Sequence, residues 1–424
     1  MKPYQKKEAV VEAYGLAKEV YANLGVNTDK AIKEALNVPV SINCWQGDDV
    51  TGFEGAQGIS GGGILATGNY PGRARNGEEL RGDAEFAFSL IPGKKRFNLH
   101  MLYAETEGKK VARDELEPEH FQKWMTWSKK KKIPLDFNPS FFSHPLAENG
   151  TLSSADPKIR QFWIRHAVAS RRIASAFGAN QGSPSVNDIW IPDGSKDLPA
   201  DRQSPRLRLR DALDEILALS LDPKTITDAV ECKLFGIGSE AYVVGSHEFY
   251  LGYAAKNGIK LCLDMGHFHP TEYISDKISA VLLFTPGLLI HFSRGLRWDS
   301  DHVSLYSDEL REVCREIFRQ SAPDRIDLAL DFFDASINRI AAWTIGSRSL
   351  RKGILEALLE PTKLLKEAEK AGKNHERLAL MEELKTFPFA AVWDKLCLDA
   401  GVPVGTDWLA PVEDYEKTTL SKRK

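Results

Sequence analysis

The sequence has few cysteines and lacks a long apolar run. Its five cysteines are scattered without C-x-x-C spacing (Cys44, Cys232, Cys262, Cys314 and Cys397). An odd, dispersed set of this kind argues against a disulfide framework and favours a reducing compartment. No stretch reaches the roughly 18 consecutive apolar residues of a membrane span, and the N-terminus has no apolar signal region. We therefore expect a cytoplasmic protein with no membrane partner.

A strong charge imbalance is also missing. The 424 residues carry a formal net charge of −3, which gives no reason to expect nucleic acid or an anionic membrane as a partner. Hydrophobic residues make up 42% and charged residues 27%, as in an ordinary globular protein with a large core. Low-complexity segments and internal repeats are absent from the sequence. The composition therefore predicts a folded protein rather than a solenoid or a disordered chain.

Short apolar runs alternate with amphipathic segments over most of the chain. Eight such runs are followed by helix-like segments, which favours a (β/α)8 TIM barrel over a doubly wound open sheet, whose dinucleotide fingerprint is absent. The expected strands are 38–44, 97–103, 133–140, 186–194, 227–235, 259–264, 288–292 and 325–332. Residues 1–36 are expected to form a helical segment, 37–345 the barrel, and 346–424 a helical extension that makes oligomer contacts.

Two further local features carry expectations. The glycine-rich stretch Gly47–Gly63 lacks the spacing of a phosphate-binding loop, so it is expected to be a flexible active-site or interface loop. A long amphipathic helix is expected after Asp156, its N-cap, with Pro157 in the first turn and Gly178 at its end.

Carboxylates and imidazoles gather where the last four expected strands end. Strand ends of a barrel meet at one rim, so these side chains should converge there. Isolated buried carboxylates cost several kcal/mol each, which a cation between them would offset. Seven candidate ligands exceed what one octahedral ion accepts while it also binds substrate, so two divalent cations that share a carboxylate are expected. The candidates are Glu231, Asp264, His267, His291, Asp299, Asp301 and Asp331, with Lys233 beside them.

Each of these residue types has a simpler alternative explanation. An acid at the end of a strand is often a helix cap, and His269, which precedes Pro270, would cap the next helix or stay exposed. His302 is expected to lie beside the ligands rather than among them. His100 would ordinarily be a satisfied core histidine, and it gains interest because its strand lines the same barrel. Three tryptophans are either core residues or platforms for a sugar face (Trp45, Trp190 and Trp298).

Several long motifs resemble the L-rhamnose isomerase family. They include V-S-I-N-C-W-Q-G-D-D-V-x-G-F-E, N-L-H-M-L-Y-A-E, N-D-I-W-I-P-D-G, E-C-K-L-F-G-I-G-S-E, L-D-M-G-H-F-H-P-T-E, R-W-D-S-D-H and L-D-F-F-D-A-S-I-N-R-I. They run in order from about Val40 to Trp343. The resemblance implies a (β/α)8 barrel, a homotetramer, and Mn²⁺-dependent, reversible isomerisation of L-rhamnose to L-rhamnulose, with Co²⁺ or Mg²⁺ as substitutes.

The resemblance also implies roles for individual residues. A structural metal would be held by Glu231, Asp264, His291 and Asp331, and a catalytic metal by His267, Asp299 and Asp301. Lys233 would contact the substrate near its carbonyl end, and His100 and Trp190 would line the pocket. Lys233, His100 and Asp331 are the expected catalytic side chains.

The expected chemistry moves a hydrogen from C2 to C1 of an open-chain 2-hydroxy aldehyde. A hydride shift is favoured over an enediol, because few carboxylates are left free to act as base. The runner-up is another two-metal barrel isomerase or epimerase of rare sugars. A metal-dependent phosphodiesterase would want more histidines and a basic rim. A non-catalytic sugar-binding protein would be exported, and no signal peptide is evident.

Overall fold

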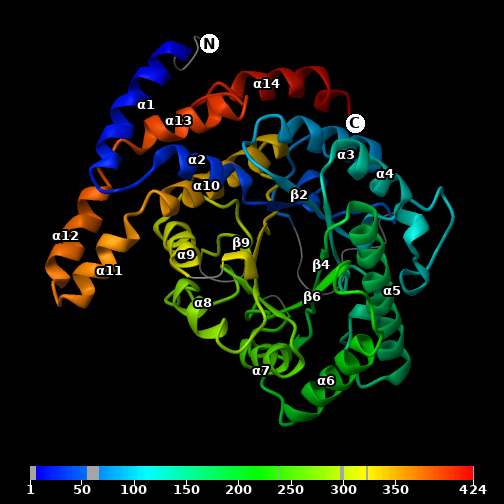
Figure 1. Ribbon diagram of the computed structural model, residues 1–424. Helices are drawn as coiled ribbons and strands as arrows, with labels where there is room; N and C mark the ends of the chain where they lie inside the picture. Colours follow the sequence, from blue (N-terminus) through cyan, green and yellow to red (C-terminus); the bar gives the residue numbers. More distant parts are fainter. Residues whose placement is uncertain (1–5, 55–65, 237, 297–299, 321–322, 424) are drawn as a thin grey trace.

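A computed structural model shows a closed parallel barrel surrounded by helices (Figure 1). It describes residues 6–54, 66–236, 238–296, 300–320 and 323–423. Eight parallel strands close in the order β1-β10-β9-β8-β6-β4-β3-β2. The expectation of a (β/α)8 TIM barrel with additional helices is confirmed. The strands are β1 Val40–Asn43, β2 Lys95–His100, β3 Leu135–Asn138, β4 Ser185–Trp190, β6 Ile226–Glu231, β8 Lys260–Asp264, β9 Leu288–Phe292 and β10 Ile326–Leu330.

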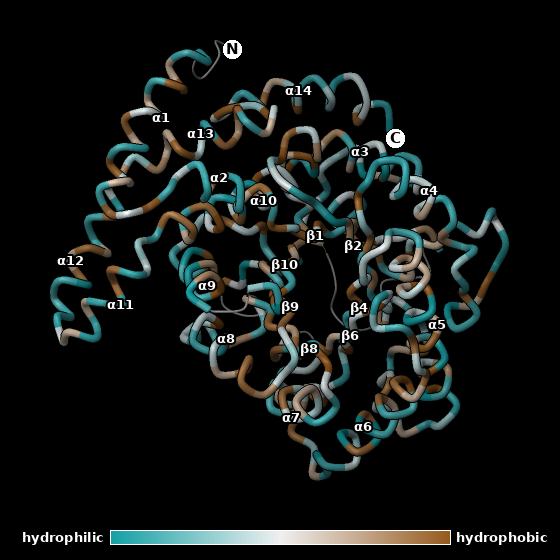
Figure 2. The backbone as a smooth tube through the Cα atoms, viewed as in Figure 1, coloured by the Kyte–Doolittle hydropathy of each residue, from teal (hydrophilic) through white to brown (hydrophobic). Residues whose placement is uncertain are grey.

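The strands are short and buried because both faces are covered. Side chains alternate between the barrel interior and the helix-covered outer face, so near-continuous apolar runs such as Leu288–Phe292 suit them. Figure 2 shows hydrophobic segments along the barrel strands and alternation of hydrophobic and hydrophilic positions in the outer helices. A small antiparallel pair, β5 Gly194–Ser195 and β7 Tyr242–Val243, lies outside the barrel.

The helices follow the strands in the expected alternation. Those that surround the barrel are α3 Gly77–Phe88, α4 Gln122–Lys131, α5 Pro157–Gln181, α6 Gln203–Leu217, α7 His247–Asn257, α8 Ser275–Val281, α9 Asp308–Arg319 and α10 Arg339–Leu358. The remaining helices are α1 Lys7–Ala22, α2 Thr28–Asn37, α11 Thr362–Lys370, α12 Asn374–Leu384, α13 Phe389–Asp399 and α14 Leu409–Thr418. In the described ranges, no helix combines the length and the hydropathy needed to cross a bilayer.

The start of α5 is as expected, and its end is not. Asp156 caps the helix by accepting a hydrogen bond from the Lys158 backbone N–H at 2.7 Å. The expectation that the helix ends at Gly178 is wrong: α5 continues to Gln181, and Gly182 adopts the left-handed conformation of the C-cap. Gly178 instead packs against the Thr225 backbone, where a Cβ would clash. Close approach, rather than helix termination, explains this glycine.

Local boundaries shift in two other places. The expected strand 97–103 ends at His100, and Met101–Tyr103 forms a short 3-10 helix. The expected Gly47–Gly63 loop begins inside a buried 3-10 helix, Cys44–Gly47, and residues 55–65 lie outside the described residues.

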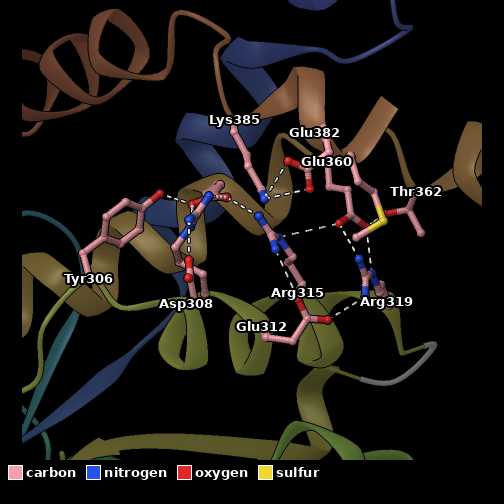
Figure 3. Close-up of polar contacts among 12 residues, drawn as sticks. Tyr306, Asp308, Glu312, Arg315, Arg319, Glu360, Thr362, Glu382 and Lys385 are labelled. Atoms are coloured by element: carbon pink, nitrogen blue, oxygen red, sulfur yellow. Dashed lines mark hydrogen bonds and ion pairs between the residues drawn. The ribbon is translucent and has the colours of Figure 1, made fainter. Parts of the chain in front are cut away.

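Helices from the N-terminal and C-terminal parts of the chain pack together on one side of the barrel (Figure 1). Helix α1 contacts α13, and α2 contacts α10. Ion pairs join α9 to the end of α10 and to the residues that follow it (Figure 3). Arg315 contacts Glu356 at 2.6 Å, and Arg319 contacts Glu360 at 2.6 Å. Within α9, Arg319 also contacts Glu312 at 3.1 Å. These contacts attach the start of the C-terminal helices to the barrel wall.

Candidate metal centre and substrate pocket

Four of the expected ligands converge at the carboxyl ends of neighbouring strands. Glu231 ends β6, Asp264 ends β8, His291 lies near the end of β9, and Asp331 follows β10. Ligand atoms of these four residues all lie within 4.8 Å of one another, a grouping that could hold a metal ion. His291 Nδ1 is 3.0 Å from Glu231 Oε1, 3.4 Å from Asp331 Oδ2 and 3.7 Å from Asp264 Oδ2.

A second group lies next to the first. Asp264, His267 and Asp301 also offer atoms within 4.8 Å of one another. His267 Nδ1 is 3.3 Å from Glu231 Oε1, so the two groups are contiguous. Asp264 belongs to both groups, which is the position that a shared carboxylate would take. The remaining expected ligand, Asp299, lies outside the described residues.

The buried acids and imidazoles of these groups shift one another's pKa values. Burial raises the pKa of Asp264 to about 7. Burial also opposes ionisation of Glu231, but His291 and His267 hold the pKa of this carboxyl well below its usual range. Burial would lower the pKa of His291, yet Cys262, Glu231 and Asp331 raise it well above the usual value. His267 and His291 therefore lie against these buried acids, and a bound cation would neutralise the same acids. Oxygen and imidazole donors together suit Mn²⁺, Co²⁺ or Mg²⁺.

The expected pocket residues lie around the same strand ends. Lys233 is buried two positions beyond Glu231, and its Nζ lies 5.4 Å from the centre of the Trp190 ring. The His100 ring contacts the Trp45 ring edge-on, with centres 4.5 Å apart. Trp45 Nε1 donates to Asp331 Oδ1 at 3.1 Å, which links this aromatic pair to the metal-type group.

His100 is neutral in this setting. Burial lowers its pKa to about 3. Its Nδ1 lies 3.2 Å from the Pro139 carbonyl, which can only accept, so the proton of the neutral ring belongs on Nδ1. This leaves Nε2 as an acceptor.

Two other histidines take the simpler roles considered for them. His269 is exposed, and its Nδ1 contacts Thr271. His302 Nδ1 lies 3.1 Å from Ser300 Oγ, and His302 belongs to none of the ligand groups found among the described residues. Trp298 lies outside those residues.

The sequence analysis missed Asp188, which the structure places beside the centre. Asp188 lies on β4 and is 1% exposed. It forms a further group with Glu231, Cys262 and His291, with ligand atoms within 4.8 Å of one another. The available signal was an acid in the middle of an otherwise strand-like run, V-N-D-I-W-I, where a charge is costly unless it has a purpose.

The fold and this constellation define a TIM-barrel enzyme with a carboxylate- and imidazole-rich centre at the mouth of the barrel. Residues 8–423 match the family model described as L-rhamnose isomerase (RhaA). The chain is 56% identical to L-rhamnose isomerase of Rhodopirellula baltica over 98% of this chain and 97% of the relative. It is also 56% identical to L-rhamnose isomerase of Yersinia pseudotuberculosis serotype IB over 98% of this chain and 99% of the relative. The chain belongs to the L-rhamnose isomerase family, and it is an isomerase.

The fold also resembles that of solved structures with low sequence identity. A structure of L-ribulose 3-epimerase aligns with a TM-score of 0.47 and 11% identity over 75% of this chain and 95% of that one.

Proposed function

We propose that the protein interconverts L-rhamnose and L-rhamnulose at the mouth of the barrel, with divalent cations as cofactors. The observation that carries this proposal is the full-length match to L-rhamnose isomerases. The convergence of Glu231, Asp264, His291 and Asp331 supports the dependence on metal. A second rare-sugar activity, as an isomerase or epimerase of another aldose or ketose, is the alternative that a substrate panel would test.

The donors fit two cations. Glu231, Asp264, His291 and Asp331 would hold a structural ion, and His267, Asp299 and Asp301 a catalytic one, with Asp264 placed to contribute to both. Mn²⁺ is the proposed ion, and Co²⁺ or Mg²⁺ are the proposed substitutes, because the donors are oxygen and imidazole. When bound, such ions act as Lewis acids that polarise the C1 carbonyl and acidify the C2 hydroxyl.

The protein side chains then position the open-chain sugar and move its protons. Lys233 carries a positive charge to the O1 end of the substrate, and the Trp190 ring offers an apolar face to the sugar carbons. His100, neutral with a free acceptor at Nε2, receives a hydrogen bond from a sugar hydroxyl. Asp331, oriented by Trp45, accepts the proton that leaves the C2 hydroxyl.

The hydrogen on C2 moves to C1 with its electron pair. The C2–H bond breaks as the C1–H bond forms, O2 becomes the ketone oxygen, and O1 gains the proton that Asp331 took from the C2 hydroxyl, which returns Asp331 to its carboxylate form. A hydride shift is proposed over an enediol because it needs no base to remove the hydrogen from C2, and the one acceptor that it does need, for the C2 hydroxyl proton, is Asp331. This route needs no external oxidant or reductant.

Assembly and location extend the same proposal. We propose a cytoplasmic homotetramer, in which the N-terminal helical segment 1–36 and the helices of residues 346–424 flank the barrel domain 37–345, and the helices of residues 346–424 provide oligomer contacts. The sugar is then the only partner apart from other copies of the chain, without nucleic acid or membrane.

The test uses L-rhamnose deuterated at C2 in ordinary water. The expected product is L-rhamnulose with the label retained on C1, because a shifted hydride does not exchange with solvent. Complete loss of the label would contradict the hydride shift and favour an enediol. Absence of any ketose from L-rhamnose, with turnover of another aldose in a panel, would contradict the substrate assignment.

A further inference from the structure

Asp188 is a buried carboxylate with no role in the proposed reaction. It points into the barrel from β4, and its two oxygens form no hydrogen bond with side chains or backbone in the described part of the chain. A buried carboxylate without a hydrogen-bond or charge partner lowers the stability of the folded protein.

The ring nitrogen of His291 that points away from the metal-type group faces Asp188. His291 Nε2 is 4.0 Å from Asp188 Oδ2, whereas Nδ1 faces Glu231, Asp264 and Asp331. Nε2 likewise has no hydrogen-bond partner among the described residues. The imidazole therefore lies between two sets of acids, one at each ring nitrogen.

Small residues make this approach across the barrel feasible. Strands β6 and β8 separate β4 from β9, and their neighbouring positions carry Ala229 and Cys262. Ala229 pairs directly with Asp188 in register. A larger side chain at either position would occupy the space between the carboxylate and the ring.

We propose that Asp188 is a positioning residue that accepts the Nε2–H of His291 and so presents Nδ1 to the metal. A neutral imidazole carries its proton on one nitrogen only, and it can ligate through Nδ1 only when that proton is on Nε2. A carboxylate beyond a ligating histidine selects this tautomer, fixes the ring plane and raises the basicity of the ligating nitrogen. Nε2 and Oδ2 are 4.0 Å apart, longer than a hydrogen bond, so the proposal requires this contact to shorten when the ion is bound. The inference rests on the metal dependence proposed above.

The same residues suggest a rival arrangement, which the test must distinguish. Asp188, Glu231, Cys262 and His291 could together hold an ion themselves. In that arrangement Cys262 would be a ligand, and a thiolate would favour Zn²⁺. In the positioning role, Cys262 lies beside His291 and Asp188 but is not a ligand.

The experiment compares Mn²⁺ binding by the full-length protein and three variants, after chelation and back-titration with electron paramagnetic resonance of free Mn²⁺. Asp188→Ala is expected to weaken Mn²⁺ binding about 10- to 100-fold at the site that His291 would ligate. Asp188→Asn, which keeps an acceptor but loses the charge, is expected to fall between Asp188→Ala and the unaltered protein. Cys262→Ser is expected to change affinity less than about 3-fold, with the number of ions per chain unchanged.

The thermal unfolding midpoint of the metal-free proteins shows whether a substitution acts on the metal site or on the stability of the fold. A positioning role leaves the metal-free midpoint of Asp188→Asn at or above that of the unaltered protein, because a buried charge has been removed without loss of volume. Equal Mn²⁺ affinity for Asp188→Ala and the unaltered protein would overturn the inference. Loss of a bound ion in Cys262→Ser would overturn it in favour of the rival site. If the unaltered protein bound no divalent ion, the proposed function itself would fail.

Discussion

The acids at the two ends of the barrel interior have different kinds of charged neighbour. At the amino end, Asp136 is held by Arg96 at 2.8 and 2.7 Å and by Ser41 at 2.6 Å, and Asp327 is paired with Lys260 at 2.6 Å. At the carboxyl end, Glu231, Asp264 and Asp331 have histidines as their charged neighbours. Acids that already have permanent cations stabilise the fold, whereas acids that lack them are suited to bind ions from solution.

The largest expected effect comes from removing a ligand at the mouth. His267→Ala is expected to lower kcat/KM for L-rhamnose by about three orders of magnitude, roughly 4 kcal/mol in the activation barrier, because the proposed catalytic ion loses a donor. The matched control is Asp327→Asn at the amino end, which should change kcat/KM by less than about 3-fold. Steady-state assays of ketose formation check both. A comparable loss of kcat/KM in His267→Ala and Asp327→Asn would contradict the proposal that only the acids and histidines at the carboxyl end serve catalysis.

The second prediction concerns the amino end of the barrel, where a substitution should lower stability and leave metal binding nearly unchanged. Asp136→Asn leaves the Arg96 guanidinium without its anionic partner, and it is expected to lower the free energy of unfolding by about 3–5 kcal/mol. Mn²⁺ affinity should stay within a few-fold, because the pair lies below the metal groups. Denaturation and metal titration of the same preparation provide the measurements. A variant that kept its stability but lost metal would show that the amino end also serves the centre.

The smallest expected effect concerns a histidine in the barrel wall rather than at the mouth. His166 is fully buried on α5, and its Nε2 accepts from the Ser140 backbone N–H at 2.9 Å, so this nitrogen must stay unprotonated. Burial lowers its pKa to about 3. Because the unfolded chain binds the proton near pH 6.5 and the folded chain does not, His166 lowers stability as pH falls from about 6.5 towards 3.

Protonation linked to His166 should lower the free energy of unfolding by about 2 kcal/mol between pH 7.5 and pH 5. Urea denaturation at fixed protein concentration, with His166→Gln as the comparison, measures it. The variant should lose that much less stability over this interval. Identical pH dependence in the two proteins would contradict the assignment of a neutral ring.

These contrasts also show how far the sequence could predict the structure. All eight strands were predicted, because buried parallel strands are apolar runs that stand out against amphipathic helices. The end of α5 was placed wrongly, since a glycine that ends a helix and a glycine that lets a helix approach Thr225 look alike in a sequence. Distinguishing them requires the neighbouring strand.

For the site, residues at strand ends were predictable and those within strands were not. Glu231, Asp264, His291 and Asp331 follow apolar runs, so their convergence followed from the geometry of a barrel. Asp188 sits inside its strand, and its proximity to His291 depends on small side chains of two intervening strands. A contact between two side chains on strands that are not neighbours in the barrel has no fixed spacing in the sequence.

The most direct test of the account is metal analysis combined with an assay of ketose formation from L-rhamnose, before and after chelation. The expected result is about two divalent ions per chain, loss of turnover when they are removed, and recovery on addition of Mn²⁺. Full activity in protein shown to be free of divalent ions would contradict the claim that the acids at the mouth of the barrel exist to hold them.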